Sequence, residues 1–357
     1  MSYNAGRFPR HVVNQFLVRI FSNGGVELST HPIEDISRTE LAEKIVKLLY
    51  YFRRTEKESG EAVDGQECLT APCTACLEEH RAKLDHFIRR SEPIHLVLPA
   101  FPAKSPNLTK VLGQLPDMGE YVGLSSLQSL CDYIGHFHPA GARITICSDG
   151  HVFGDVVGVT DDAVTEYRVR LAEMIETANC SSLDLYGLDD AFGGVDYPKL
   201  RQVLEANYAP SVEELKEDVR TDSATRSLFN GIHRFMFEDA VGVRGDKASR
   251  TALRNESKEL AYQTISRSNA WSRVVAERFP EAVRLSIHPQ SPHSQKIGVR
   301  LLRTRDAWLT PWHGVVLDDG AKLSLVKKWD AEKLEASVVW RNGRPSHFVA
   351  PQSAIKS

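Results

Sequence analysis

Short apolar runs alternate with a longer helical pattern through the middle of the chain. Four runs have the length of β-strands: Ile94–Leu98, Arg143–Cys147, Leu183–Tyr186 and Val283–Ile287. Between the second and third runs, apolar residues from Val164 to Ile175 recur at helical spacing after Asp161, which can cap the helix. This order of strand, helix and strand predicts an α/β fold with a largely parallel, Rossmann-like sheet flanked by helices.

The N-terminal part of the chain has a different pattern. Residues 11–30 surround Asn23-Gly24-Gly25, a turn signal that predicts a hairpin. Apolar residues from Leu41 to Phe52 follow helical spacing, with Thr39 as the expected N-cap. Residues 55–70 are polar and contain glycine, which predicts a loop.

Turn signals dominate the C-terminal part. Asp318-Asp319-Gly320 and Asn342-Gly343 separate short β-rich runs, so residues 310–350 predict a small antiparallel element. We therefore divide the chain into three parts: an N-terminal hairpin and helical segment at residues 1–90, an α/β catalytic core at 91–314, and a β-rich extension at 315–357.

Composition and charge exclude several classes of protein. With 42% hydrophobic and 25% charged residues, the chain has the composition of a globular protein. Its net charge of −3 provides no broad cationic field, so we expect no nucleic-acid partner. No apolar run approaches the ~20 residues of a membrane span, and the N-terminus lacks the apolar stretch of a secretory signal. We expect a cytoplasmic protein with no membrane partner.

Three of the six cysteines lie close together in the sequence. Cys68, Cys73 and Cys76 have the spacing C-x4-C-x2-C, and His80 and His86 follow. Thiolate and imidazole ligands at such spacing can hold a structural zinc ion, but zinc sites usually draw ligand pairs from two places in the chain. The alternative is a set of reduced packing thiols, and we assign no metal ligand from the sequence.

Polar residues follow the predicted strands, where a ligand crevice is expected in an open α/β sheet. Lys104 and Ser105 follow the first strand within a proline-rich loop, and Asp149 and His151 follow the second. His288 follows the last. We expect these loops to converge on one active site.

Each of these residues also has an ordinary structural interpretation. Lys104 can be an exposed loop lysine, and Asp117 and Glu120 can simply begin a helix, where acidic side chains complement the dipole. Asp149-Gly150 can be a plain turn. The sequence contains none of the usual motifs for dinucleotide binding, P-loop nucleotide binding, esterase activity or zinc-protease activity. No common motif therefore predicts the reaction.

Five motifs in a fixed order identify a family. They are FPAKSPN (101–107), PDMGE (116–120), SDGHVFGD (148–155), RLSIHPQ (284–290) and TPWHG (310–314). Together they resemble the isocyanide (isonitrile) synthases of the pyoverdine and dityrosine biosynthesis family. The resemblance implies a secondary-metabolism transferase that converts the α-amino group of L-tyrosine or L-tryptophan into an isonitrile. The carbon donor would be ribulose 5-phosphate, and tyrosine is the expected substrate.

The resemblance also implies roles for the motif residues. Lys104 is expected to be catalytic or to contact the sugar phosphate, and Asp149, His288 and His313 are expected to carry protons. The expected substrate-binding residues are Ser105, Asp117, Glu120, Arg284 and Lys296. Among them, Asp117 and Glu120 would hold the substrate ammonium, and Arg284 and Lys296 the phosphate.

No cofactor is expected, because condensation, C–C cleavage and phosphate loss formally need neither a redox group nor a metal. The expected pathway partner is a separate Fe(II)/2-oxoglutarate oxygenase acting on the product, since some relatives carry one as a fused domain and this sequence does not. Two alternatives are an enzyme that forms N-formyl-tyrosine and a non-catalytic sugar-phosphate-binding protein.

Overall fold

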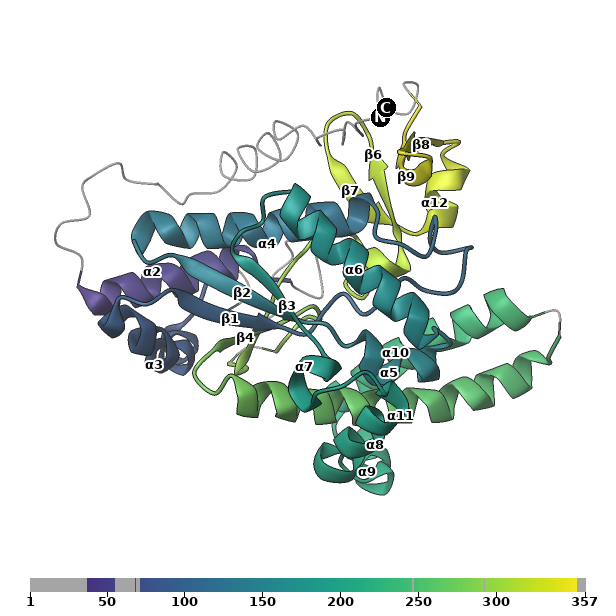
Figure 1. The fold of residues 1–357 in the computed structure, drawn as a ribbon, viewed down its shortest axis with the longest axis horizontal. Coiled ribbons are helices and arrows are strands. Elements are labelled where there is room, and N and C mark those ends of the chain that lie inside the picture. Colours follow the sequence, from purple (N-terminus) through teal and green to yellow (C-terminus); the bar gives the residue numbers. More distant parts are fainter. Residues whose placement is uncertain (1–36, 55–67, 69–70, 246, 292, 352–357) are drawn as a thin grey trace.

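The computed structural model describes residues 37–54, 68, 71–245, 247–291 and 293–351 (Figure 1). The hairpin predicted at residues 11–30 and nearly all of the loop predicted at 55–70 lie outside the described residues. None of the helices in the described part of the chain combines the length and the apolar character that crossing a membrane requires.

A parallel sheet forms the centre of the molecule (Figure 1). Its strand order is β3-β2-β1-β4-β5, and each neighbouring pair is parallel. The strands are β1 (Ile94–Leu98), β2 (Ala142–Cys147), β3 (Leu183–Tyr186), β4 (Val283–Ser286) and β5 (Lys296–Gly298). All four runs predicted as strands are therefore strands, and the predicted α/β fold is confirmed.

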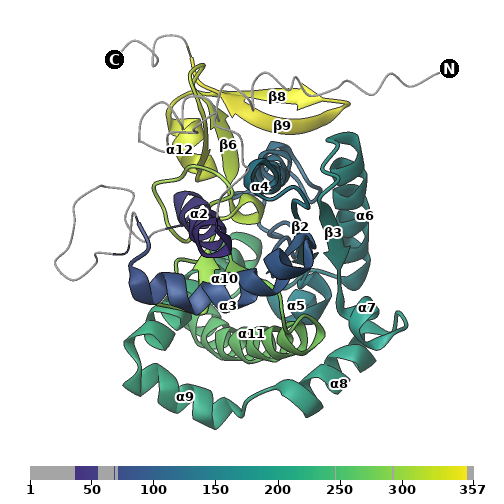
Figure 2. The same cartoon turned by 90° about the vertical axis from the view of Figure 1, so that its left-hand side faces the viewer.

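Helices cover both faces of this sheet, because successive side chains of a strand point to opposite faces. Leu96 and Leu98 of β1 pack in one apolar cluster with Leu124 of α4 (Met118–Phe137). Val97 packs in a second cluster with Trp271 of α11 (Arg250–Arg278). Figure 2 shows α4 and α11 on opposite sides of β2. Burial on both faces explains why β1 is apolar at every position except His95.

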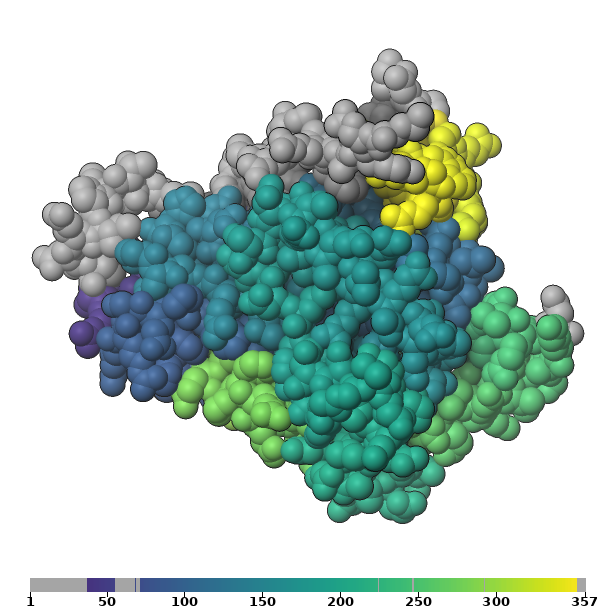
Figure 3. Space-filling view, in the orientation of Figure 1, coloured from purple at the N-terminus to yellow at the C-terminus, as the bar shows by residue number. Residues whose placement is uncertain are grey.

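The remaining helices surround this frame. They are α2 (Arg38–Tyr51), α3 (Thr74–Arg90), α5 (Gly150–Val157), α6 (Asp161–Thr177), α7 (Leu188–Phe192), α8 (Tyr197–Tyr208), α9 (Val212–Thr221), α10 (Ser223–Arg244) and the short 3-10 helix η1 (Pro311–His313). The long α10 and α11 pack against each other, and their joined ends project from one side of the molecule (Figure 3).

Two predicted helix starts were placed slightly wrongly. The N-cap of α2 is Ser37 rather than Thr39, because Ser37 and Glu40 form a reciprocal capping box. The N-cap of α6 is Thr160 rather than Asp161, since the Thr160 side chain accepts a hydrogen bond from the backbone N–H of Ala163. The helices themselves lie where their apolar spacing predicts them.

A second, smaller sheet lies near the C-terminus, in the order β7-β6-β9-β8. Its strands are β6 (Val315–Asp318), β7 (Leu323–Val326), β8 (Ser337–Arg341) and β9 (Arg344–Val349), and α12 (Lys328–Lys333) joins the two hairpins. Both hairpins turn at the predicted signals, with positive φ at Asn342 and Gly343. The predicted antiparallel character holds within each hairpin, but β6 and β9 pair in parallel, so the sheet is mixed.

Candidate active site

A cavity of about 520 Å³ lies at the carboxyl ends of β1, β2 and β4. Loops after these three strands line it, together with η1 and the facing sides of α10 and α11. Lys104, Ser105, Asp149 and His288 are among the lining residues, so the loops after the strands do converge as expected. His313 of η1 joins them.

Glycine at position 150 lets α5 approach the loop after β1. A Cβ atom on Gly150 would lie 2.0 Å from the carbonyl oxygen of Pro102 and 2.6 Å from Val164 Cγ1, distances that real contacts do not show. The loop is fixed further by a hydrogen bond from the Ser148 hydroxyl to the Phe101 carbonyl, at 3.0 Å. The cavity wall is therefore set by backbone packing as well as by side chains.

Lys104 forms a buried charge cluster with the first turn of α4. Its Nζ lies 2.9 Å from Asp117 Oδ2 and 2.8 Å from Glu120 Oε2, and it donates to the carbonyl oxygen of Pro311 at 3.0 Å. The hydroxyl of Tyr167 donates to the other Glu120 oxygen. An ammonium has three N–H donors, so Lys104 has none left for another ligand.

The Lys104 cluster carries one cation and two carboxylates without access to bulk water. Burial works against the charged ammonium, but Asp117 and Glu120 outweigh it, so the pKa of Lys104 is raised. Burial raises the pKa of Asp117 to about 7, against the opposing effect of Lys104. One proton of this cluster therefore titrates near neutral pH.

Asp149 is the N-cap of α5, but its side chain makes no capping hydrogen bond. Its Oδ1 is buried and has no hydrogen-bond partner among the described residues. Removal from water raises the pKa of Asp149 to about 7, and a hydrogen bond from its own backbone N–H offsets this only in part. A carboxyl group with such a pKa on a cavity wall can both give and take a proton at neutral pH.

Two histidines of the cavity are neutral at pH 7. Burial and the nearby positive charge of Arg54 lower the pKa of His288 to about 3. The Nδ1 atom of His288 has no hydrogen-bond partner among the described residues. Burial likewise lowers the pKa of His313 to about 3. The His313 ring stacks on Phe235, with ring centroids 5.1 Å apart, and its Nδ1 lies 3.1 Å from the Thr310 hydroxyl. At neutral pH each ring therefore carries one N–H group and one nitrogen that can accept a hydrogen bond.

Arg284 and Lys296 lie side by side on β4 and β5, beside the cavity but not on its wall. Both contact the Ser272 hydroxyl of α11, Arg284 at 2.6 Å and Lys296 at 3.1 Å. Burial and the neighbouring Arg284 lower the pKa of Lys296 to about 8. Ser272 is about one helical turn from Ser268, which lines the cavity. The two cations thus stand next to the site rather than within it.

The remaining predicted loop residues have varied surroundings. Ser105 lines the cavity, and its hydroxyl accepts a hydrogen bond from the backbone of Asn107. His151 points elsewhere and stacks on Tyr197, with centroids 3.5 Å apart. Asp189, also close to a strand end, pairs with Arg168. Adjacency to a strand end therefore does not by itself place a side chain in the cavity.

Sequence reasoning missed the aromatic walls. Residues of this kind that line the cavity are Phe153, Phe235, Trp308 and Trp312. Trp308 packs on His288, with centroids 5.1 Å apart. Phe235 belongs to α10, a helix that no motif marks and whose contribution depends on the packing of α10 against α11.

Comparison with known proteins identifies the family. The model of the pyoverdine/dityrosine biosynthesis protein family matches residues 84–339, well over half of the chain. This chain belongs to that family. The matched range contains all five motifs from which the resemblance was predicted, and the prediction is confirmed.

Curated relatives of the family cover nearly the same length. An L-tryptophan isonitrile synthase of Fischerella ambigua is 42% identical over 317 residues, 89% of this chain and 94% of the relative. An L-tyrosine isonitrile synthase of Pseudomonas aeruginosa is 39% identical over 327 residues, 90% and 98% of the two chains. The crystal structure of PvcA from Pseudomonas aeruginosa matches with a TM-score of 0.80 and 39% identity, covering 87% of this chain and 99% of that one. The chain is an enzyme of the isonitrile synthase kind.

Proposed function

We propose that the chain converts the α-amino group of an aromatic L-amino acid into an isonitrile, with ribulose 5-phosphate as the carbon donor. The observation that carries the proposal is the combination of Asp149, His288 and His313 around one cavity with aromatic walls. Relatives named for tryptophan and for tyrosine isonitrile synthesis add support.

The reaction needs proton transfers at several points. The substrate amine must lose a proton before its nitrogen attacks the ketose carbonyl, and the carbonyl oxygen must gain protons to leave as water. His288 and His313 are neutral, but a pKa of about 3 makes each ring too weak a base for the first task, so we propose that they orient the amine by accepting hydrogen bonds. Asp149, with a pKa of about 7, suits both tasks: its carboxylate takes the proton from the amine, and the carboxylic acid then donates it to the departing water.

Lys104 has a different role in this proposal from the one its motif implies. All its donors are occupied, so it does not hold the sugar phosphate. Asp117 and Glu120 face Lys104, so they do not hold the substrate ammonium either. We propose that the three residues hold the loop after β1 against α4 and η1, and that the buried Asp117 can bind or release one proton near pH 7.

Arg284 and Lys296 are the proposed phosphate clamp. Among the described residues, no carboxylate contributes to the pKa shift of either side chain, so this partly buried pair has no acidic partner in that part of the chain. A phosphate group would supply that partner, with the Ser272 hydroxyl between the two cations as a further donor. Ser105, on the cavity wall, is proposed to contact the substrate directly.

L-tyrosine is the proposed substrate and L-tryptophan the alternative. The aromatic rings of Phe153, Phe235 and Trp308 offer faces on which either side chain can pack. Relatives named for the two amino acids match this chain at similar identity, so identity does not choose between them. A separate Fe(II)/2-oxoglutarate oxygenase that acts on the isonitrile remains the proposed pathway partner.

Mass spectrometry of the product tests the proposal. Purified protein is incubated with ribulose 5-phosphate and, separately, with L-tyrosine and L-tryptophan. An isonitrile from one of them would establish the activity and the substrate together. A product heavier by one water would indicate the N-formyl alternative, and no product from folded protein with either amino acid would refute the substrate assignment.

A further inference from the structure

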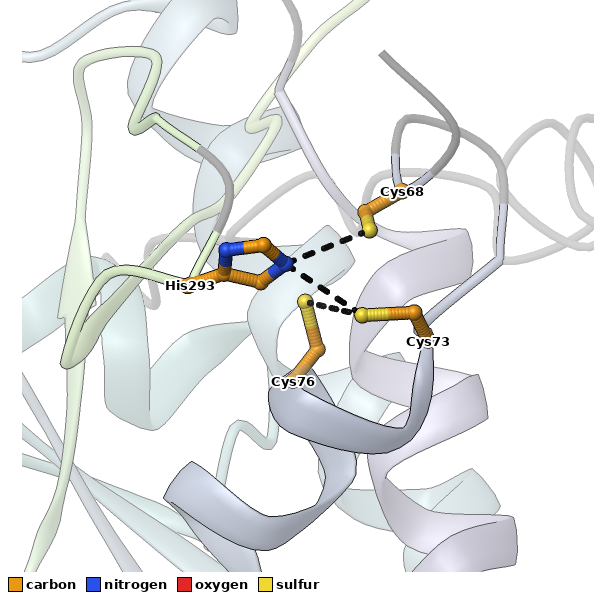
Figure 4. Close-up of side chains that lie close together, drawn as sticks. All are labelled: Cys68, Cys73, Cys76 and His293. Carbon is orange, nitrogen blue, oxygen red and sulfur yellow. Dashed lines mark hydrogen bonds between the residues drawn. The ribbon is translucent and has the colours of Figure 1, made fainter. Parts of the chain in front are cut away.

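Four potential metal ligands meet at the edge of α3, away from the cavity (Figure 4). Cys73 is the N-cap of α3 and Cys76 lies in its first turn, while Cys68 comes from the chain before the helix. The fourth ligand is His293, from the loop between β4 and β5, more than 200 residues later. Zinc sites usually draw ligands from two places in the chain, and here the fold brings the second one, His293, to the three cysteines.

The distances match those of a tetrahedral zinc site. Zinc binds thiolate sulfur at about 2.3 Å and imidazole nitrogen at about 2.0 Å, so tetrahedral geometry separates two sulfurs by about 3.8 Å and sulfur from nitrogen by about 3.5 Å. Cys73 Sγ and Cys76 Sγ lie 3.8 Å apart. His293 Nε2 lies 3.3 Å from Cys73 Sγ and 3.6 Å from Cys68 Sγ. All four ligand atoms lie within 4.8 Å of one another.

The chemistry of the thiols also suits a cation. The three cysteines are free, and a sulfur separation of 3.8 Å is far longer than the ~2.05 Å of a disulfide bond. Thiolate sulfur and imidazole nitrogen are the ligand atoms that zinc prefers, and this cluster offers three of the first and one of the second.

We propose that Cys68, Cys73, Cys76 and His293 bind a structural zinc ion. Four protein ligands leave no open position, as in structural rather than catalytic zinc sites. The proposed ligands differ from those considered from the sequence, where His80 was weighed beside the three cysteines and no metal ligand was assigned. His80 is buried within α3 and does not belong to the ligand cluster.

The zinc ion has a specific structural task, because it joins α3 to the loop that carries His288. His293 lies five residues after His288 in that loop. Arg53 already bridges the same two segments, donating to the carbonyl oxygens of Cys68 at 2.6 Å and Gln290 at 2.9 Å. Zinc therefore adds a second connection between the chain around α3 and the loop after β4.

Metal analysis of the full-length protein tests this proposal. Protein purified from zinc-supplemented cells should contain about one zinc ion per chain by mass spectrometry of the metal. Cys76→Ala and His293→Ala should lose most of it. His86→Gln and Cys180→Ala are matched controls, because neither residue belongs to the cluster, and both variants should keep the wild-type zinc content.

Cobalt provides a second readout that needs no variant. Wild-type protein stripped with a chelator and titrated with Co²⁺ should develop a thiolate-to-cobalt charge-transfer band and the strong visible bands of tetrahedral cobalt. His293→Ala should change the visible bands if it folds. The proposal is overturned if wild-type protein holds no zinc and gives no such band, or if Cys76→Ala and His293→Ala both retain full zinc.

Discussion

Replacing Lys104 with methionine tests the buried charge cluster. The substitution keeps an unbranched side chain of similar length but leaves Asp117 and Glu120 facing each other without their cation. Breaking a buried ion pair by removing one partner costs about 3 to 5 kcal/mol. For 357 residues, an unfolding entropy of about 2 cal/mol/K per residue converts this loss into a decrease in Tm of roughly 4 to 7 °C.

The loss should depend on pH in a defined direction. Without Lys104, burial and mutual repulsion raise the folded-state pKa of the two carboxyl groups above their unfolded values. The folded state then binds more protons than the unfolded state, so its stability rises as pH falls. Lys104→Met should therefore be closer to wild type at pH 5 than at pH 8.

Thermal unfolding followed by circular dichroism measures these effects. Lys322→Met is the matched control, because Lys322 is half exposed and faces the partly exposed Asp319, so its loss should stay below about 1 kcal/mol. The double variant Lys104→Met/Glu120→Gln should recover part of the stability, since glutamine removes one charge and still completes a capping box. A Lys104→Met variant as stable as the control, or equally destabilised at both pH values, would refute the reasoning.

Three further predictions concern the cavity and its neighbours. Asp149→Asn should abolish turnover but raise the free energy of unfolding at pH 8 by up to about 4 kcal/mol. The reason is that burial raises the pKa of this carboxyl group from 3.8 to about 7, so that its ionised form destabilises the fold. Unchanged turnover, or an equal gain in stability at pH 5, would contradict this. Gly150→Ala should lower Tm and activity together, because its Cβ would meet the Pro102 carbonyl, whereas Gly113→Ala, with open space, should do neither. Arg284→Gln should raise the KM for ribulose 5-phosphate at least tenfold and leave the KM for the amino acid unchanged; equal effects on both would remove it from the phosphate clamp.

Much of the fold could be predicted because local signals were strong. Runs such as Ile94–Leu98 are apolar at all but one position, as expected for a strand covered on both faces, and four short runs rich in apolar residues were found in this way. β5 (Lys296–Gly298) was missed because three residues, one of them a lysine, carry no periodicity. The parallel pairing of β6 with β9 was missed because hairpin turns specify only neighbouring strands.

The site was harder to predict, because its properties arise from contacts between distant segments. The motifs led to Asp149, His288 and His313, which line one cavity. Nothing local indicates that Lys104 is buried, since that follows from the packing of its loop against α4 and η1. His293 could not be assigned to the cysteines, because only the β4–β5 loop brings it to them.

The transfer of the donor carbon tests the central claim most directly. Wild-type protein is given the preferred aromatic amino acid and ribulose 5-phosphate carrying ¹³C at the donated carbon, and the product is examined by ¹³C NMR. We predict that the label appears in the isonitrile carbon bonded to the former α-amino nitrogen. An isonitrile without the label would contradict the proposed donor, and label found only in unreacted sugar phosphate would contradict the proposed reaction.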